Sequence, residues 1–255
     1  MCVFHTDDQT RIDQLYQKGC AKIRIPSNHG DSGLQAVMIN SSGGMTGGDR
    51  IDWDFQVGEN AGLTVTTQAC ERVYKSPSDT AVTEIKLKVG EQAQLSWLPQ
   101  ETIVFDQSAL RRTITAELSD GAELLLVEPL LIGRKAMDET IRKAHFSDRW
   151  RIHRDGVLVH AEDFRLTGSV DETLNQAAVA GGQVAMATAL LVAPRGEALL
   201  DEARSVIGEL GSASFWNGKL LARLIAEDGY SLRQRLVPLI KLLNPSATLP
   251  KIWST

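Results

Sequence analysis

The chain has 255 residues, of which 43% are hydrophobic and 23% charged, and a formal net charge of −5 at pH 7. This composition is ordinary for a soluble globular protein, and the length fits one large all-β domain or two small ones. The negative charge argues against general binding of nucleic acid or of an anionic membrane. The sequence shows neither the roughly 20-residue apolar run of a membrane-spanning helix nor a secretory signal.

Residues 1–18 are polar and are expected to form a flexible lead-in. From Gly19 onward, apolar and polar residues alternate in short runs, which predicts strands with one face in the core. These runs are 21–25, 51–57, 63–67, 85–89 and 93–97. The pattern predicts a β-rich part over residues 19–170.

A glycine-rich stretch, AVMINSSGGMTGGDR at residues 36–50, lies between two of these apolar segments. Four glycines in six residues allow positive φ and close backbone approach, so the stretch is either a tight corner or a backbone-lined site. A phosphate-binding loop needs Gly-Lys-Ser/Thr, whereas Gly48 is followed by Asp49 and Arg50. Asp49 would also repel an anion. A tight β corner is therefore the favoured interpretation.

A turn sequence recurs along the β-rich part. It reads GENA at residues 58–61, GEQA at 90–93 and, in shortened form, DGA at 120–122. Turn–strand units at a spacing of roughly thirty residues are typical of stacked β-layers or a solenoid. Independent hairpin turns also favour Gly, Asp and Asn, so the repeat leaves both explanations open.

Residues 171–255 have a mixed character with C-terminal helices. Residues 172–193 are rich in Ala, Gln and Met, and Gly181 and Gly182 interrupt any long helix there. Apolar residues follow helical spacing over 199–207. Ser231 is expected to cap a final helix that Pro238 kinks or restarts. This helix either packs on its own domain or docks into a partner; its apolar positions include Leu232, Leu236, Leu239 and Ile240.

Several carboxylates lie beside predicted strands, namely Glu71, Glu101, Asp106 and Glu128. Such groups serve as general acids and bases, as ligands of hard cations, or as partners of buried cations; for any one residue the last role is the commonest. The available cations are Arg72, Arg111 and Arg112.

No catalytic or tight metal motif accompanies these carboxylates. The five histidines form no HxH or HExxH pattern, and no serine lies in GxSxG. His153 and His160 flank an Asp155-Gly156 turn and could face each other across a hairpin. The three cysteines are widely spaced without a CxxC pair, which suits a reducing cytoplasm.

Read together and in order, a set of segments closely resembles the urease accessory protein D family (UreD, called UreH in some organisms). The resemblance covers nearly the whole chain and implies a single domain over residues 19–255. The segments are GCAKIR at 19–24, NSSGGMTGGD at 40–49, TTQACERVY at 66–74, WLPQETI at 97–103, LIGR at 131–134, WRIHRDG at 150–156 and LPKIW at 249–253.

The resemblance implies a mainly β, helical or solenoid-like structure with a few helices, mostly toward the C-terminus. It implies a cytoplasmic chaperone without enzymatic activity. Such a protein would act as a scaffold that binds apo-urease, UreF and the GTPase UreG, and would support insertion of nickel into the urease metallocentre. It would bind no nucleic acid or membrane and hold no tightly bound cofactor, only weakly and transiently bound nickel.

The resemblance further implies a transient nickel route at Asp49, Glu71 and Glu101, where carboxylate oxygens would hold the metal less tightly than clustered Cys and His. Cys70 could add a soft ligand near Glu71. Ion pairing is an equally open role for these carboxylates. The partner-binding residues expected in the final helix are Leu232, Arg235, Leu236, Leu239 and Ile240.

Two other classes of function are compatible with the pattern. One is a β-solenoid carbohydrate-active enzyme that uses paired carboxylates from Asp49, Glu71 or Glu101. Such enzymes tend to display exposed aromatic subsites, and only 5% of this chain is aromatic. The other is an unrelated β-rich binding module.

Overall fold

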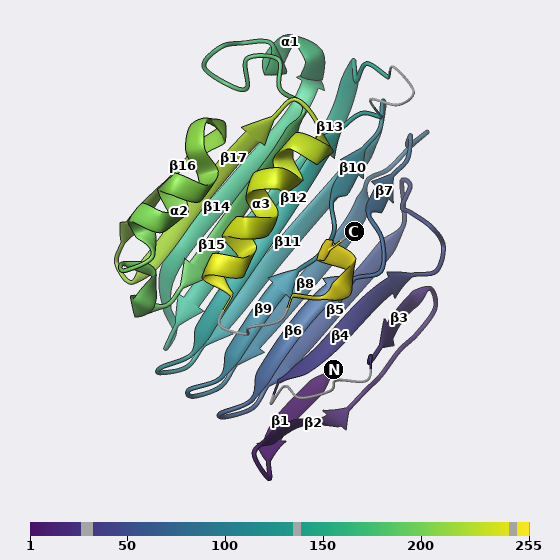
Figure 1. Ribbon diagram of the computed structural model, residues 1–255. Coiled ribbons are helices and arrows are strands. Elements are labelled where there is room, and N and C mark those ends of the chain that lie inside the picture. Colours follow the sequence, from purple (N-terminus) through teal and green to yellow (C-terminus); the bar gives the residue numbers. More distant parts are fainter. Residues whose placement is uncertain (27–32, 135–138, 245–248, 255) are drawn as a thin grey trace.

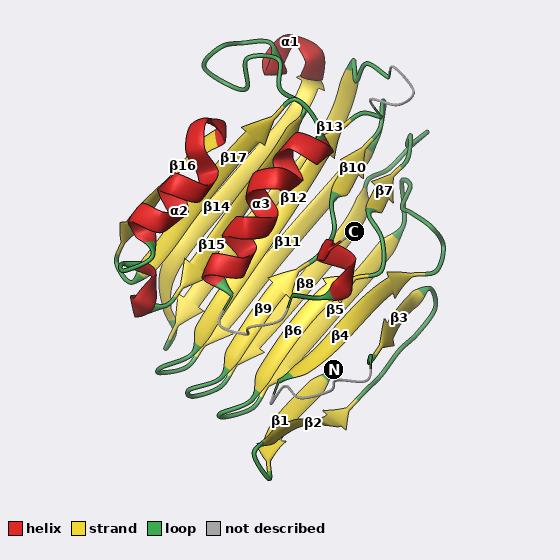
Figure 2. Cartoon of the chain, viewed as in Figure 1, coloured by secondary structure: helices red, strands yellow, loops and turns green. Residues whose placement is uncertain are grey.

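The computed structural model describes residues 1–26, 33–134, 139–244 and 249–254 and shows two stacked β-sheets with helices over one outer face (Figure 1, Figure 2). The mainly β, solenoid-like fold with helices near the C-terminus is confirmed. The strands are β1 (Cys2–Thr6), β2 (Gln9–Gln14), β3 (Ala21–Arg24), β4 (Leu34–Asn40), β5 (Arg50–Val57), β6 (Gly62–Thr67), β7 (Glu71–Val73), β8 (Ala81–Val89), β9 (Gln94–Leu98), β10 (Thr102–Val104), β11 (Ala109–Leu118), β12 (Glu123–Ile132), β13 (Lys143–Arg154), β14 (Val157–Ser169), β15 (Ala185–Val192), β16 (Gly211–Trp216) and β17 (Lys219–Ala226).

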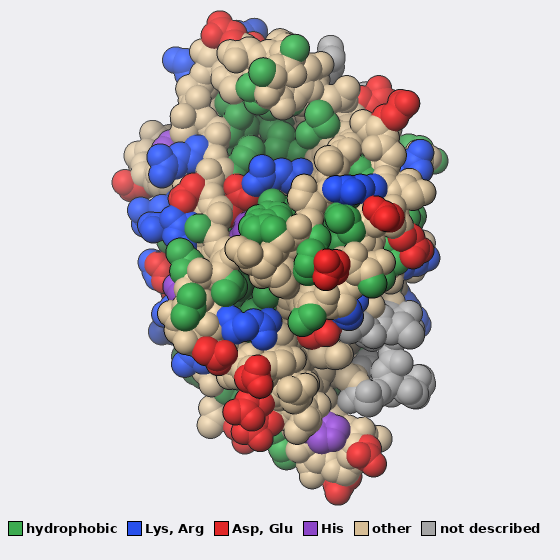
Figure 3. All heavy atoms as spheres, turned by 90° about the vertical axis from the view of Figure 1, so that its left-hand side faces the viewer, with side chains coloured by type: hydrophobic (Ala, Val, Ile, Leu, Met, Phe, Trp, Pro, Cys, Tyr) green, Lys and Arg blue, Asp and Glu red, His purple; other side chains and the backbone are tan. Residues whose placement is uncertain are grey.

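The α-helices are α1 (Val170–Leu174), α2 (Leu200–Ile207) and α3 (Gly229–Leu243), and a 3-10 helix, η4, spans Lys251–Ser254. Sheet A has seven strands in the order β14-β13-β11-β8-β5-β1-β2. Sheet B has ten: eight in the order β16-β17-β15-β12-β9-β6-β4-β3, together with β7 and β10, which pair with each other and, through β10, with β12. Figure 3 views the side of the molecule that lies to the left in Figure 1.

The chain winds between the two sheets as a solenoid. Strands β5, β8, β11 and β13 are parallel neighbours in sheet A, and β4, β6, β9 and β12 are parallel neighbours in sheet B. The recurring turns therefore stack: Asn60 donates its N–H to the carbonyl of Glu91 at 3.0 Å, and Gln92 donates to Asp120 at 3.2 Å. The repeat thus reflects stacked layers, not independent hairpins.

Apolar side chains fill two layers. One lies between the sheets, and the other lies between sheet B and helices α2 and α3. Strand β12 shows why: Leu124 and Leu126 join the core between the sheets, while Leu125 and Val127 join the core under the helices. A strand buried on both faces reads as a continuous apolar run.

Three elements differ from the sequence expectations. The polar lead-in contains the hairpin β1–β2, which extends sheet A by pairing with β5; only Val3 and Thr10 of this hairpin are buried, so its pattern is weak. Residues 185–192, within the Ala-rich segment, form strand β15. Small side chains fit there because both faces of β15 are covered. The final helix is capped by Asp228, whose carboxylate accepts the N–H of Ser231 at 2.8 Å.

Two further local expectations are resolved. Helix α3 runs through Pro238 as one element. Asp155 and Gly156 form a hairpin turn with φ of 48° and 76°. His160 pairs with Ile152, and His153 pairs with Leu158 across a register shift, so the two histidines are not cross-strand partners.

No helix among the described residues is both long and apolar enough to cross a membrane.

Candidate functional site

The glycine-rich stretch is a tight corner that packs on residues 71–79. Met45 donates its N–H to Arg72, and Tyr74 donates to Met45, each at 2.8 Å. A Cβ on Gly44 would lie 2.3 Å from the ring of Tyr74, and one on Gly47 would lie 2.0 Å from the hydroxyl of Ser76. These contacts leave no room for a side chain at Gly44 or Gly47. Gly43 and Gly48 have open space but adopt φ of 81° and 86°, which glycine tolerates best.

The corner places Asn40 against Glu71. The Asn40 Nδ2 atom donates to the Glu71 Oε1 atom at 3.0 Å and to the carbonyl of Gly44 at 3.1 Å. Burial raises the pKa of the Glu71 carboxyl to about 6, although the hydrogen bond from Asn40 favours the ionised form, and the charge of Asp49 raises the pKa further. Near neutral pH this carboxyl is thus close to its titration range.

Glu71 lies where two cavities meet. The first, of about 120 Å³, is also lined by Asn40, Cys70 and Arg72. The second, of about 50 Å³, extends toward Arg112 and Glu128. Both cavities share the side chains of Met38, Trp53, Thr67 and Glu71. A small cation entering the first cavity would therefore meet Glu71 before it reached the second.

A buried charge cluster closes the second cavity. Arg112 bonds both oxygens of Asp148, at 3.0 Å and 2.6 Å, and also contacts Glu128. Trp97 donates its indole N–H to Glu128 at 2.7 Å. Burial raises the pKa of Glu128 to about 7 against the opposing charge of Arg112, and the charge of Asp148 adds to the rise. One guanidinium faces two carboxylates, so the cluster favours an additional proton or cation.

Glu101 is engaged elsewhere. The residue is 2% exposed, and its carboxylate accepts hydrogen bonds from Arg233 at 2.6 Å and 3.1 Å and from the thiol of Cys70 at 3.3 Å. Burial opposes ionisation, but the hydrogen bonds and charge of Arg233 outweigh it and hold the pKa of Glu101 below its usual value. Burial raises the pKa of Cys70 to about 11, so this thiol stays protonated at neutral pH.

The three carboxylates of the expected nickel route thus occupy different settings. Asp49 is exposed and accepts the N–H of Thr46 at 2.8 Å, which closes the corner. Glu71 lines the cavities, and Glu101 lies in an ion pair. Among the described residues, no three His, Cys, Asp or Glu side chains come together as a metal-binding group. The arrangement could guide a cation from Asp49 to Glu71 more readily than it could retain one.

Sequence reasoning named Glu128 and Arg112 among its charged pairs but missed Asp148 and Asn40. A signal for Asp148 was present, because it alternates with buried Phe146 and Trp150 along β13 and so falls on the inner face. Asn40 carries no comparable signal. Its role depends on how the glycine corner folds back onto β7.

Helix α3 packs its apolar face on sheet B. Leu232, Leu236, Leu239 and Ile240 are fully buried in the core beneath the helices, so these four side chains lie out of reach of a partner's surface. Arg235 is exposed. Docking through this helix stays a prediction, and it would have to use the exposed face that includes Arg235.

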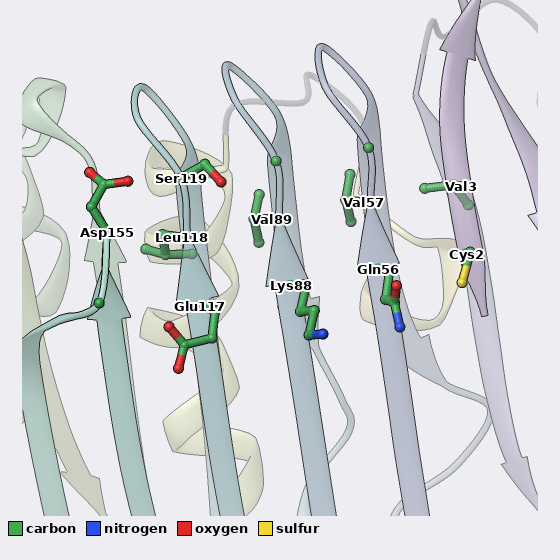
Figure 4. A pocket seen from close by; sticks show the side chains of 13 residues that line it. Cys2, Val3, Gln56, Val57, Lys88, Val89, Glu117, Leu118, Ser119 and Asp155 are labelled. Atoms are coloured by element: carbon green, nitrogen blue, oxygen red, sulfur yellow. The ribbon is translucent and has the colours of Figure 1, made fainter.

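A groove of about 470 Å³ crosses the turn end of sheet A (Figure 4). Gln56, Lys88 and Glu117 are neighbours across β5, β8 and β11, whereas Val57, Val89 and Leu118 are buried in the core. The groove is open, and its charged side chains are ordinary cross-strand neighbours. It pairs no nucleophile with a base and lies apart from Glu71, so it offers no catalytic arrangement.

Comparison with known proteins covers almost the whole chain. The family model described as "UreD urease accessory protein" matches residues 2–254. The chain is 55% identical to the urease accessory protein UreD of Mesorhizobium japonicum, over 97% of this chain and 90% of that protein. It is 49% identical to UreD of Rhizobium leguminosarum bv. viciae (97% and 91% covered) and 48% identical to UreD of Agrobacterium fabrum (97% and 87% covered).

Proposed function

This chain belongs to the UreD urease accessory protein family, and on that premise we propose that it is a cytoplasmic, non-enzymatic chaperone of urease maturation. It binds apo-urease together with UreF and the GTPase UreG, and it supports insertion of nickel into the urease metallocentre. The relatives named above are accessory proteins, which supports a role without catalysis. In this scheme nickel is cargo that passes through the complex, held weakly and transiently.

One observation carries the nickel part of the proposal: Glu71 lies at the junction of two adjoining cavities that lead from the glycine corner to Glu128. Carboxylate and amide oxygens bind a divalent transition metal less tightly than Cys and His clusters do. Weak ligation suits transfer because a tightly bound ion would not move on. The route therefore runs from Asp49 past Glu71, with Glu128 as the next carboxylate; Glu101 would act only if it exchanged its ion pair with Arg233.

The carbohydrate-active alternative gains no support from this placement. A glycosidase needs two carboxyl groups that face each other across a substrate cleft. Glu101 is buried against Arg233, and Glu71 lies in a cavity of about 120 Å³. These two groups do not flank a groove that could receive a polymer.

The test is activation of purified apo-urease by this protein with UreF, UreG, Ni²⁺ and GTP. Glu71→Gln keeps the size of the side chain but removes its charge, so the complex should assemble while activation slows severalfold. Glu59→Gln, in an exposed turn, is the matched control. If Glu71→Gln activates urease normally, the nickel route lies elsewhere. If activation is then lost only when the whole protein is omitted, that result still supports the scaffold role.

A further inference from the structure

The two sheets end at different strands on the side that faces the viewer in Figure 3. Sheet A ends at the thirteen-residue strand β14, which pairs with β13 and, among the described residues, with no strand on its other side. Glu162 on β14 contacts Arg223 on β17, so β14 lies opposite β17. Sheet B continues by one more strand, β16. Strand β16 therefore projects past the end of sheet A.

The projecting strand exposes its inner face. Ala213 and Phe215 point into the core beneath the helices, so the alternate residues Ser212, Ser214 and Trp216 point the other way. Both serines are exposed, and Trp216 is 38% exposed. We call these three residues the shelf. A strand added to the edge of β14 would lie opposite the shelf and cover it.

The outer face beside this edge is rich in positive charge. Asp163 on β14 has three cationic neighbours: Arg151 at 2.5 Å, Arg149 at 3.8 Å and Arg165 at 4.0 Å. Three guanidinium groups thus share a single carboxylate. In Figure 3, several Lys and Arg side chains lie along the left flank of this side, with Asp and Glu side chains among them. A strand that paired with β14 would therefore bind more tightly if its own side chains on this outer face were acidic.

We propose that an extended segment of a partner protein, with acidic side chains at alternate positions, adds to β14 as an eighth strand of sheet A. Its backbone would pair with the open edge of β14, its acidic side chains would face Arg165, and its intervening small or apolar side chains would cover the shelf. Strand addition of this kind gives affinity through backbone hydrogen bonds and specificity through alternate side chains.

Two features of the edge bear on this choice of occupant. Glu162 points inward on β14, and an inward charge usually protects an edge strand from pairing. Here Arg223 neutralises that charge. A second copy of this chain is a poor occupant, because in a two-fold arrangement the projecting β16 strands would collide before the two β14 edges met. A single extended segment meets no such obstacle.

The test uses the full-length protein and a synthetic peptide of about ten residues, a typical strand length, that alternates Thr and Glu. Hydrogen exchange should slow in β14 when this peptide is added, and a Thr–Lys peptide should have no effect. Arg165→Glu should weaken binding at least about tenfold. Arg165 is exposed, so the variant should fold, and Arg24→Glu on the distant strand β3 is the matched control.

Unchanged exchange in β14 at millimolar Thr–Glu peptide would overturn the proposal, as would equal binding to Arg165→Glu and the unmodified protein. Sedimentation distinguishes the other occupant. Self-association that Arg165→Glu abolishes would show that a second copy, and not a partner segment, covers this edge.

Discussion

Arg233 on helix α3 donates hydrogen bonds to both carboxylate oxygens of Glu101, which precedes β10, at 2.6 Å and 3.1 Å. The same guanidinium contacts Gln100 and lies 5.2 Å from the ring centre of Trp253 in η4. The pair therefore joins the C-terminal helices to the part of the solenoid next to Glu71. A substitution of either Glu101 or Arg233 should therefore affect both the C-terminal helices and the solenoid next to Glu71.

Arg233→Met should lower the free energy of unfolding by about 3 kcal/mol, because it leaves the buried carboxylate of Glu101 without its cation. Urea denaturation at pH 7 measures the loss. Arg235→Met, two residues along on the exposed face of the same helix, should cost less than about 0.5 kcal/mol. Equal stability of the two variants would show that the Glu101 ion pair contributes little.

The buried cluster should make stability depend on pH through Glu128. Its folded-state pKa, about 7, is higher than the 4.5 of an unperturbed Glu, so the stability that its proton confers is present below pH 4.5 and is lost as the pH rises through about 7. Glu128→Gln cannot ionise and keeps an acceptor for Trp97. Between pH 5 and 8 the variant should therefore gain about 2 kcal/mol relative to the unmodified protein.

Denaturation curves at several pH values, with Glu59→Gln as the exposed control, would measure this gain. A difference between Glu128→Gln and the unmodified protein that stays constant across the range would mean that Glu128 remains ionised in the folded state throughout.

The stacked turns place a residue in the left-handed region at the same point of each layer: Asn60 at φ 57°, Gln92 at 53° and Gly121 at 63°. Gly121→Ala should destabilise the fold by about 1 kcal/mol because an L side chain is strained there, and the new Cβ would also displace Gln92. Gly62→Ala, at a site with ordinary contacts, is the control and should cost less. Thermal denaturation of the two variants gives the comparison.

Much of the β-rich part could be predicted from the sequence, because burial of one strand face produces alternation and stacking repeats the same turn. The glycine corner was likewise recognisable, because positive φ and close approach together favour four glycines there. The spacing over 199–207 predicted helix α2, and that over 232–243 predicted α3.

What could not be predicted depends on contacts distant in sequence. Strand β15 lies between β12 and β17 and beneath the helices, so its alanines reflect the limited space there. In the sequence alone, an alanine-rich segment of this kind looks the same as one that forms a helix. The pairing of Glu101 with Arg233 joins residues 132 positions apart. The cavities at Glu71 are likewise lined by strands from both sheets, among them β4, β5, β6, β9 and β12. The carboxylates were therefore identifiable from the sequence, but their separate settings were not.

Trp253 tests whether the C-terminal segment is a structural part of the domain. Its side chain is 2% exposed, and its indole N–H donates to the carbonyl of Leu98 at 3.0 Å, next to the strand end that leads to Glu101. Trp253→Ala should cost about 3–5 kcal/mol, the usual range for removing a buried aromatic side chain. Trp216→Ala, at a site 38% exposed, should cost about 1 kcal/mol or less. Urea denaturation of both variants measures these changes in the free energy of unfolding. Equal changes would mean that η4 does not hold the Leu98 strand end in place.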